Sequence, residues 1–255
     1  MKMTITALMG AAMISSVASA DVYSWDWSAA VNGTSGLNMA AGEFQSIHAE
    51  YNDASERFLW SVTFADQITD GYTLAINDGP NPKGHAGELG LIYFDASNGA
   101  PIVTVYAYNG VNSQNSYADG SPAAGTQAPD MILASDGVTN HASIMQASVV
   151  DDMMNGTRTM TLELDATIIN NHIPANPGPD GPSEWTGVQF AELLGLWMHP
   201  VTNLNASYDS EMALTSWGGT QGWFDGANFT TTVPAPGAFA LLGMGGLVMS
   251  RRRRS

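Results

Sequence analysis

The stretch from Arg158 to Ile169 constrains the fold more than any other, because apolar and polar residues alternate along it. The apolar positions are Met160, Leu162, Leu164, Ala166 and Ile168, and the polar positions are Thr159, Thr161, Glu163, Asp165 and Thr167. Successive side chains of a β-strand point to opposite faces of its sheet, so this period of two predicts a strand with one buried face. Such a face needs a second layer to pack against.

The same alternation recurs between residues 40 and 230, interrupted by turns rich in Asn, Asp and Gly. It predicts further strands at 42–51, 57–65, 71–78, 88–94 and 102–108. The faces expected to be buried are Gln45, Ile47, Ala49 and Tyr51 in the first of these, and Phe58, Trp60, Val62 and Phe64 in the second. A helical turn is expected at 185–194, and long loops at 109–130 and 173–183.

Many short strands with few helical patterns indicate an all-β fold. We expect an antiparallel two-sheet β-sandwich or jelly roll over residues 21–232. The chain has no cysteine, so neither a disulfide framework nor a thiolate site can stabilise it. Its stability must come from one sizeable apolar core, which a body of this length can form.

The first 20 residues have the pattern of a secretory signal helix. Lys2 supplies a positive charge, an apolar run follows from Ile5 to Val17, and Ala18 and Ala20 flank a small residue ahead of the acidic Asp21. This small-x-small pattern predicts export through the Sec machinery, with cleavage after Ala20.

The C-terminal segment, residues 233–255, has a second pattern. Val233, Pro234, Ala235, Pro236 and Gly237 form a helix-breaking motif, residues 237–250 are uncharged and mostly apolar, and Arg251, Arg252, Arg253 and Arg254 follow. A helix of 14 residues spans only about 21 Å, against a hydrocarbon core of about 30 Å. The arginines resist translocation. We therefore expect a short transmembrane helix that holds the protein only for a time.

A Pro motif, an apolar helix and a terminal Arg cluster resemble the PEP-CTERM sorting signal of bacterial exported proteins. The resemblance covers about the last 23 residues. It implies that an exosortase in the membrane recognises and processes the chain, which is then released to the cell surface or the extracellular matrix. The motif has Ala235 where that family most often has Glu.

The charge of the body excludes nucleic acid as a partner. Between residues 21 and 250 there are 24 acidic residues and only three basic ones, Arg57, Lys83 and Arg158. Phosphate backbones are bound by Lys and Arg, whereas an acidic surface attracts divalent cations. A structural Ca²⁺ is therefore possible, and the loop acids Asp78, Asp151, Asp152 and Asp180 are its candidate ligands. None of them has EF-hand spacing, so the ligand set stays unknown.

Glu163 and Asp165 form the one pattern that suggests catalysis. Acids at i and i+2 of a strand share a face, and retaining glycosidases hold a nucleophile and an acid/base in this way. The pair resembles the Glu-x-Asp-x-x-Glu strand of laminarinase-type hydrolases, but Ile168 occupies the position of the third carboxylate. No nucleophile elbow, zinc-protease motif or phosphate loop is present. The sequence therefore favours a non-catalytic protein without an organic cofactor, and a secreted polysaccharide-active glycoside hydrolase is the alternative.

Two tryptophans suggest a glycan site. Trp217 and Trp223 flank the glycine-rich segment Gly218–Gly222, which is expected to be a turn that can expose indole rings for sugar stacking. Core packing is the competing interpretation of both residues. The sequence thus predicts an exported, surface- or matrix-associated protein that binds extracellular polysaccharide or Ca²⁺.

Overall fold

The computed structural model describes residues 21–29, 37–77, 87–110, 130–135, 143–170, 188, 190, 192–210, 212, 214–230 and 233–234. The chain divides into two units, Asp21–Val233 and a second one made of Met1–Ala20 and Pro234–Ser255. The predicted signal helix, the C-terminal helix at 237–250 and the Arg cluster lie outside the described residues. Within the described ranges, no helix has the length and apolar character needed to cross a membrane.

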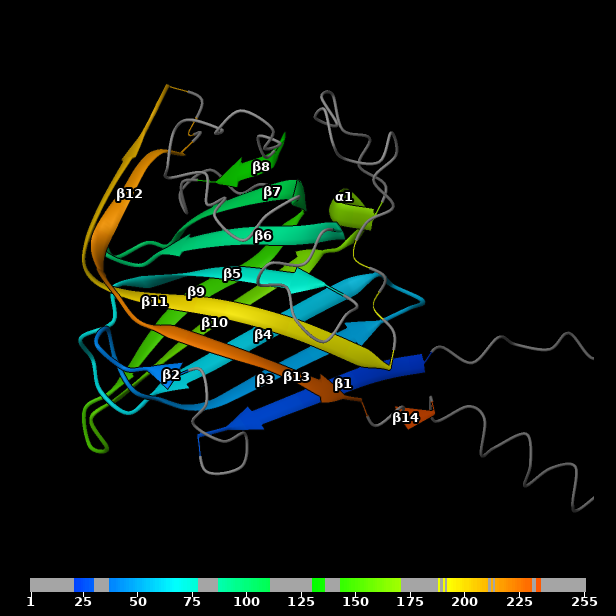
Figure 1. Ribbon diagram of the computed structural model, residues 1–255, viewed down its shortest axis with the longest axis horizontal. Coiled ribbons are helices and arrows are strands. Elements are labelled where there is room, and N and C mark those ends of the chain that lie inside the picture. The colour runs from blue at the N-terminus through cyan, green and yellow to red at the C-terminus, as the bar shows by residue number, and fades with distance from the viewer. Residues whose placement is uncertain are drawn as a thin grey trace, which may run out of the picture. The chain divides into compact units, whose positions relative to one another are not determined.

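The described body consists of strands in two antiparallel sheets, as Figure 1 shows. The six-stranded sheet has the order β14 (Val233–Pro234), β1 (Asp21–Ser28), β3 (Phe44–Asn52), β4 (Arg57–Phe64), β10 (Thr157–Asp165) and β9 (Ile144–Asp152). The eight-stranded sheet has the order β2 (Leu37–Asn38), β13 (Trp223–Phe229), β11 (Leu193–Tyr208), β5 (Gly71–Asn77), β6 (Gly87–Asp95), β7 (Ile102–Gly110) and β8 (Asp130–Ser135), and β12 (Leu214–Gln221) pairs with β11. The all-β, two-sheet architecture is confirmed, and the jelly roll stays a prediction.

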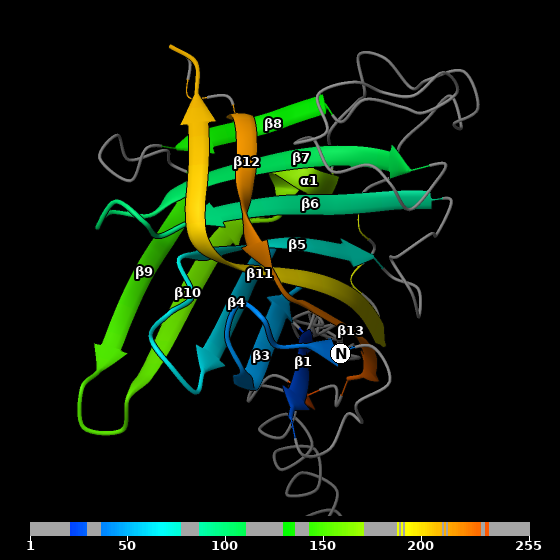
Figure 2. The ribbon, with the colours of Figure 1, turned by 60° about the vertical axis from the view of Figure 1, so that its left-hand side comes forward.

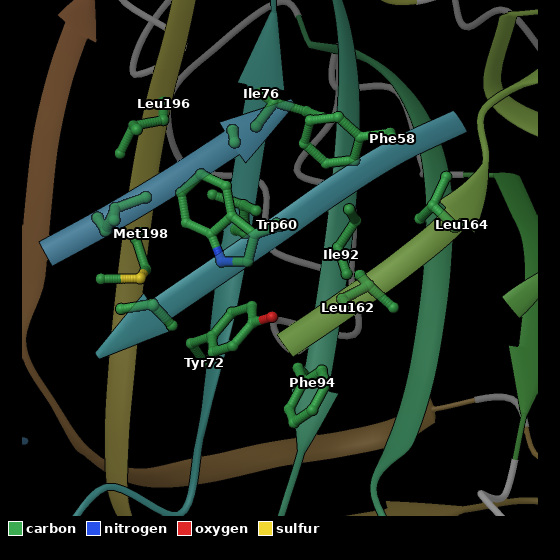
Figure 3. Close-up of a cluster of buried hydrophobic side chains, with 14 of the residues drawn as sticks. Phe58, Trp60, Tyr72, Ile76, Ile92, Phe94, Leu162, Leu164, Leu196 and Met198 are labelled. Carbon is green, nitrogen blue, oxygen red and sulfur yellow. The ribbon is translucent and has the colours of Figure 1, made fainter. Parts of the chain in front are cut away.

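The main core lies between the two sheets, where the apolar faces of their strands pack against each other (Figure 3). From the six-stranded sheet come Phe58, Trp60, Leu162 and Leu164, and from the eight-stranded sheet come Tyr72, Ile76, Ile92, Phe94, Leu196 and Met198. All ten side chains are fully buried. The alternation in β4 and β10 therefore marked the core face of the six-stranded sheet.

The structure corrects two of the predicted strands. Gln45 was expected on the buried face of its strand, but it is exposed, because the β3–β4 register shifts between Phe44 and Ser46. The strand expected from Arg158 to Ile169 ends at Asp165, and Thr167–Asn170 form the short helix α1. The Asp165 carboxylate accepts hydrogen bonds from the amide and hydroxyl of Thr167 at 3.0 and 2.6 Å, which favours the helical turn.

Strand β11 leaves the eight-stranded sheet halfway along its length. Its first half pairs with β13 and β5, whereas the residues from Val201 onward pair with β12. The ribbon of β11 and β12 runs across β6 to β8 instead of alongside them (Figure 2). Beneath it lies a second apolar cluster, formed by Ala75, Leu91, Tyr93, Tyr106, Val201, Leu214 and Trp217. The outer face of this sheet is therefore partly covered, which explains why β5 is buried on both faces.

The glycine-rich segment Gly218–Gly222 is not the predicted turn. It continues from β12 into β13, with Gly222 as the only break between the two strands. Gly219 has a φ of 143°, and a Cβ there would lie 2.6 Å from the Val201 side chain. A Cβ on Gly222 would lie 2.3 Å from the Asn38 carbonyl oxygen. The glycines therefore permit close backbone approach where the ribbon departs from the sheet.

Tyr208 ties the far end of the ribbon to β6. Its hydroxyl donates a hydrogen bond of 2.9 Å to the buried Asp95 carboxylate, whose other oxygen accepts bonds from Ser97. Burial, together with the Asp95 charge, raises the pKa of Tyr208 above its ordinary value, so the hydroxyl stays protonated as a donor. The buried carboxylate is thereby supplied with partners.

A charge placed on the core face of β10 should unfold the protein, and a charge on its outer face should not. Leu162→Asp buries an unpaired carboxylate in the main core and should lower the free energy of unfolding by about 4 kcal/mol or more. Thr161→Asp removes the hydroxyl contact with Ser61 on the outer face and should cost only about 1 kcal/mol. Urea unfolding followed by circular dichroism compares them, and equal losses would contradict the assigned faces.

Candidate functional site

Four side chains form a block on the outer face of the eight-stranded sheet, next to the point where the ribbon departs. Trp197 and His199 lie on β11, and Trp223 and Asp225 lie on β13. Trp197 is registered with Asp225 across the two strands, and residues two apart on a strand share a face. We call these four residues the aromatic patch.

The local sequence explains why these side chains point outward. Leu194, Leu196 and Met198 are fully buried in the main core, so the residues between them project from the other face. Phe224 is likewise buried, between Trp223 and Asp225. The aromatic patch therefore consists of the outward-facing residues of two neighbouring strands, and the residues that alternate with them face inward and form the core.

The aromatic patch presents ring surface together with polar groups. Trp223 is 37% exposed, and Trp197, His199 and Asp225 are partly exposed. The rings of Trp197 and His199 meet edge to face, with centroids 4.4 Å apart. Indole rings, an imidazole and a carboxylate at one site can combine stacking on an apolar ligand face with hydrogen bonds to its polar groups.

Trp217 and Trp223, the pair proposed from the sequence, are not brought together. Trp217 is registered with Ala206 on β11, whereas Trp223 follows Gly222 beside the first half of β11. The Trp217 ring is 7% exposed and packs edge-on against Tyr93, with centroids 5.1 Å apart. Trp217 therefore belongs to the cluster under the ribbon. Of these two tryptophans, Trp223 is the one at the surface.

The acid pair Glu163 and Asp165 lies on β10, and both carboxylates are engaged. Glu163 forms an ion pair with Arg57, while Asp165 caps α1. The cross-strand neighbours of Glu163 are Leu59 and Gln146, neither of which is acidic. Ile168, at the position of the missing third carboxylate, lies on α1 and not on the strand. This arrangement lacks the facing pair of free carboxylates that glycoside hydrolysis requires.

The candidate Ca²⁺ ligands that the structure describes are already bonded within the protein. Asp151 forms a two-pronged ion pair with Arg158, at 2.7 and 2.8 Å, which lowers the pKa of Asp151. Asp152 accepts hydrogen bonds from Met154 and Asn155, which lower its pKa as well. Asp78 and Asp180 lie outside the described residues. In the described part of the chain, no group of three or more acidic or histidine side chains could hold a metal ion.

A histidine on the opposite side of the body is held between two acids. The Nδ1 and Nε2 atoms of His48 on β3 lie 2.7 and 3.2 Å from the carboxylates of Asp26 and Glu50. Partial burial opposes protonation, but the hydrogen bonds and charges of both acids outweigh it and raise the pKa of His48 above 6.5.

Trp197 was not among the predicted site residues, although the sequence carries a signal for it. Residues 194–198 alternate in the order Leu, Gly, Leu, Trp, Met, which predicts a strand with Trp197 on the face opposite the leucines. The expected helical turn at 185–194 obscured it. Leu193 and Leu194 in fact begin β11.

Comparisons of the chain with protein-family models, with curated proteins and with solved structures found no match.

The raised pKa of His48 predicts a local dependence of stability on pH. The folded state binds the proton more tightly than the unfolded state, so the stabilisation is fully present below pH 6.5 and is lost as the pH rises through the folded-state pKa. Since the site is partly exposed, the effect should be below about 1 kcal/mol. Thermal melting of the wild type and of His48→Gln should be compared from about pH 5 to about pH 9. The difference between their melting temperatures should shrink at high pH. A difference that grows with pH would contradict the ion-pair geometry.

Proposed function

We propose that this chain is an exported, non-catalytic β-sandwich protein of the cell surface or extracellular matrix that binds neutral polysaccharide at the aromatic patch. The observation that carries the proposal is the placement of Trp197 and Trp223 on one outer sheet face. A sheet with an ordered core holds these rings in fixed positions, so little conformational entropy is lost when a ligand stacks on them. Asp225 and His199 supply acceptors and donors for sugar hydroxyls.

The charge of the protein favours an uncharged glycan over an acidic one. The body carries only Arg57, Lys83 and Arg158 as basic residues. Two of them, Arg57 and Arg158, are paired with Glu163 and Asp151. An acidic polysaccharide would meet a repulsive field with little basic surface to offset it. A neutral chain meets no such barrier.

The bonding of Glu163 supports binding without turnover. Glycoside hydrolysis needs a second carboxylate beside the first, whereas Glu163 is paired with Arg57 and its cross-strand neighbours are Leu59 and Gln146. Hydrolysis therefore stays the alternative, and the binding assay below distinguishes it.

The terminal sequence motifs supply the localisation part of the proposal. The compact unit begins at Asp21, the residue after the proposed cleavage site, and β1 begins there too. The backbone nitrogen of Asp21 lies 2.9 Å from the Asp53 carboxylate. Cleavage after Ala20 would turn this amide into an α-ammonium group facing that carboxylate, so the processed chain keeps its first strand and gains an ion pair. The segment from Val233 to Arg254 would act as the sorting signal for an exosortase.

Removal of a patch ring should weaken glycan binding. Trp197→Ala and Trp223→Ala should each weaken binding of neutral polysaccharides such as dextran, xylan and mixed-linkage β-glucan by tenfold or more, about the loss of 1–3 kcal/mol expected for one stacked ring. Affinity electrophoresis, with and without added Ca²⁺, measures the shift. Ile68→Ala, which removes an exposed apolar side chain outside the patch, is the matched control.

Reducing-sugar release, measured on the same samples, decides between binding and catalysis. The proposal predicts none in the wild type. Release that disappears in Glu163→Gln would replace the binding function with hydrolysis, and retained binding in both tryptophan variants would remove the aromatic patch as the site.

Export predicts a defined N-terminus. N-terminal sequencing of the protein recovered from the cell surface should begin at Asp21, because Ala18 and Ala20 provide the small residues that signal peptidase requires. Ala18→Leu should block processing and leave the precursor in the membrane fraction. A surface-exposed protein that still begins at Met1 would refute cleavage.

A further inference from the structure

In the part of the chain that the structure describes, the six-stranded sheet ends in an open edge at β9. Only β10 pairs with this strand among the described residues, and β9 is the outermost strand of the hairpin at the lower left of Figure 2. It has nine residues, whereas the strands at the other ends of the two sheets are shorter: β2 and β14 have two residues each and β8 has six. An open strand presents a row of unpaired backbone N–H and C=O groups, to which another strand can add.

The side chains of β9 do not protect this edge. From Ile144 to Val150 there is no charged residue and no proline, the two devices with which proteins most often block an edge. One irregularity, opposite Glu163 and Leu164, affects only the beginning of the strand. Two apolar side chains on the strand are open to solvent, Met145 at 51% and Val150 at 61% exposure.

Two acids at or beside β9 are paired with arginines, although the protein as a whole is strongly acidic. Arg57 pairs with Glu163, and Arg158 pairs with Asp151. These are two of the three basic residues of the body, and both serve acids at or beside β9. From Ile144 to Asp151 the edge therefore has low net charge, and Asp152 at its end is hydrogen-bonded to Met154 and Asn155. The acidic surface elsewhere repels a second copy of the protein.

We propose that β9 pairs antiparallel with β9 of a second copy of this chain, which joins the two six-stranded sheets into one continuous sheet. A two-fold axis perpendicular to the sheet makes such an interface isologous, so that each copy contributes the same surface. The absence of charged residues from Ile144 to Val150, and the pairing of Asp151 with Arg158, favour a second copy over a partner of opposite charge.

The faces of β9 require that the two-fold axis passes through a residue and not between two residues, and Ser148 is the middle residue of the nine. Ser148 is registered with Thr161 on the outer face, and Ala147 and Val149 are registered with core residues of β10. Residues directly opposite each other in an antiparallel pair must lie on the same face of the sheet. An outer-face residue of β9 therefore lies opposite an outer-face residue of the partner strand.

With Ser148 on the axis, each copy places Val150 opposite Gln146 and Val149 opposite Ala147 of the other. The exposed Val150 side chain is then covered, and the inner face gains an apolar contact. The two Asp151 side chains are six positions apart along the strands, about 20 Å, which exceeds the screening length at physiological salt.

A single cysteine at the two-fold axis tests the pairing directly, because the natural chain contains none. The full chain carrying Ser148→Cys, treated with a short bismaleimide, should give a covalent dimer on a denaturing gel. The control is Met154→Cys at the tip of the hairpin, which is 95% exposed and therefore reacts more readily in random collisions. It should give monomer.

Charge repulsion provides the second measurement. The double variant Gln146→Lys and Ser148→Lys places four ammonium groups around the axis and should reduce the dimer fraction, by light scattering, at least tenfold, while circular dichroism stays unchanged. A dimer that persists in the double variant, equal cross-linking at positions 148 and 154, or a monomeric wild type would each overturn the proposal.

Discussion

Strand β11 takes part in both apolar cores, and the rest of the eight-stranded sheet depends on how it is held. Its first half contributes Leu194, Leu196 and Met198 to the core between the sheets, and its second half contributes Val201 to the cluster on the outer face. At the change of direction stands Pro200, which has no amide hydrogen to donate, and its carbonyl accepts the amide of Gly222 at 2.9 Å. A strand anchored in two cores cannot slide, because a shift of one residue would reverse every face.

The aromatic patch follows from this anchoring. Trp197 and His199 lie between buried residues of β11, just before the ribbon departs, and the neighbouring strand β13 adds Trp223 and Asp225. Since the buried neighbours fix the backbone, the rings are presented from a rigid strand and not from a loop. The bonded state of Glu163 and Asp165 removes the one acid pair that suggested catalysis. These two features are the basis of the proposal that the protein binds glycan without turning it over.

The strands with unbroken alternation could be predicted from the sequence, and the departures arose where a tertiary contact decides. Phe58, Trp60, Val62 and Phe64 are all buried as expected, because nothing interrupts the period of two in β4. Strand β1 carried a similar signal in Tyr23, Trp25 and Trp27, but its place next to the signal peptide concealed it. The segment Gly218–Gly222 looked like a turn because glycine favours turns. Its glycines instead admit the neighbouring backbones, which only the sheet topology reveals.

Glycan binding to the outer face at the aromatic patch can be observed on the rings themselves. The chain has seven tryptophans, and each indole N–H gives its own signal in a two-dimensional ¹H–¹⁵N NMR spectrum. Titration with a neutral oligosaccharide should shift the signals of Trp197 and Trp223 and leave the buried Trp25, Trp27 and Trp60 in place. A spectrum in which neither Trp197 nor Trp223 moves, while binding is detected by another method, would contradict the account.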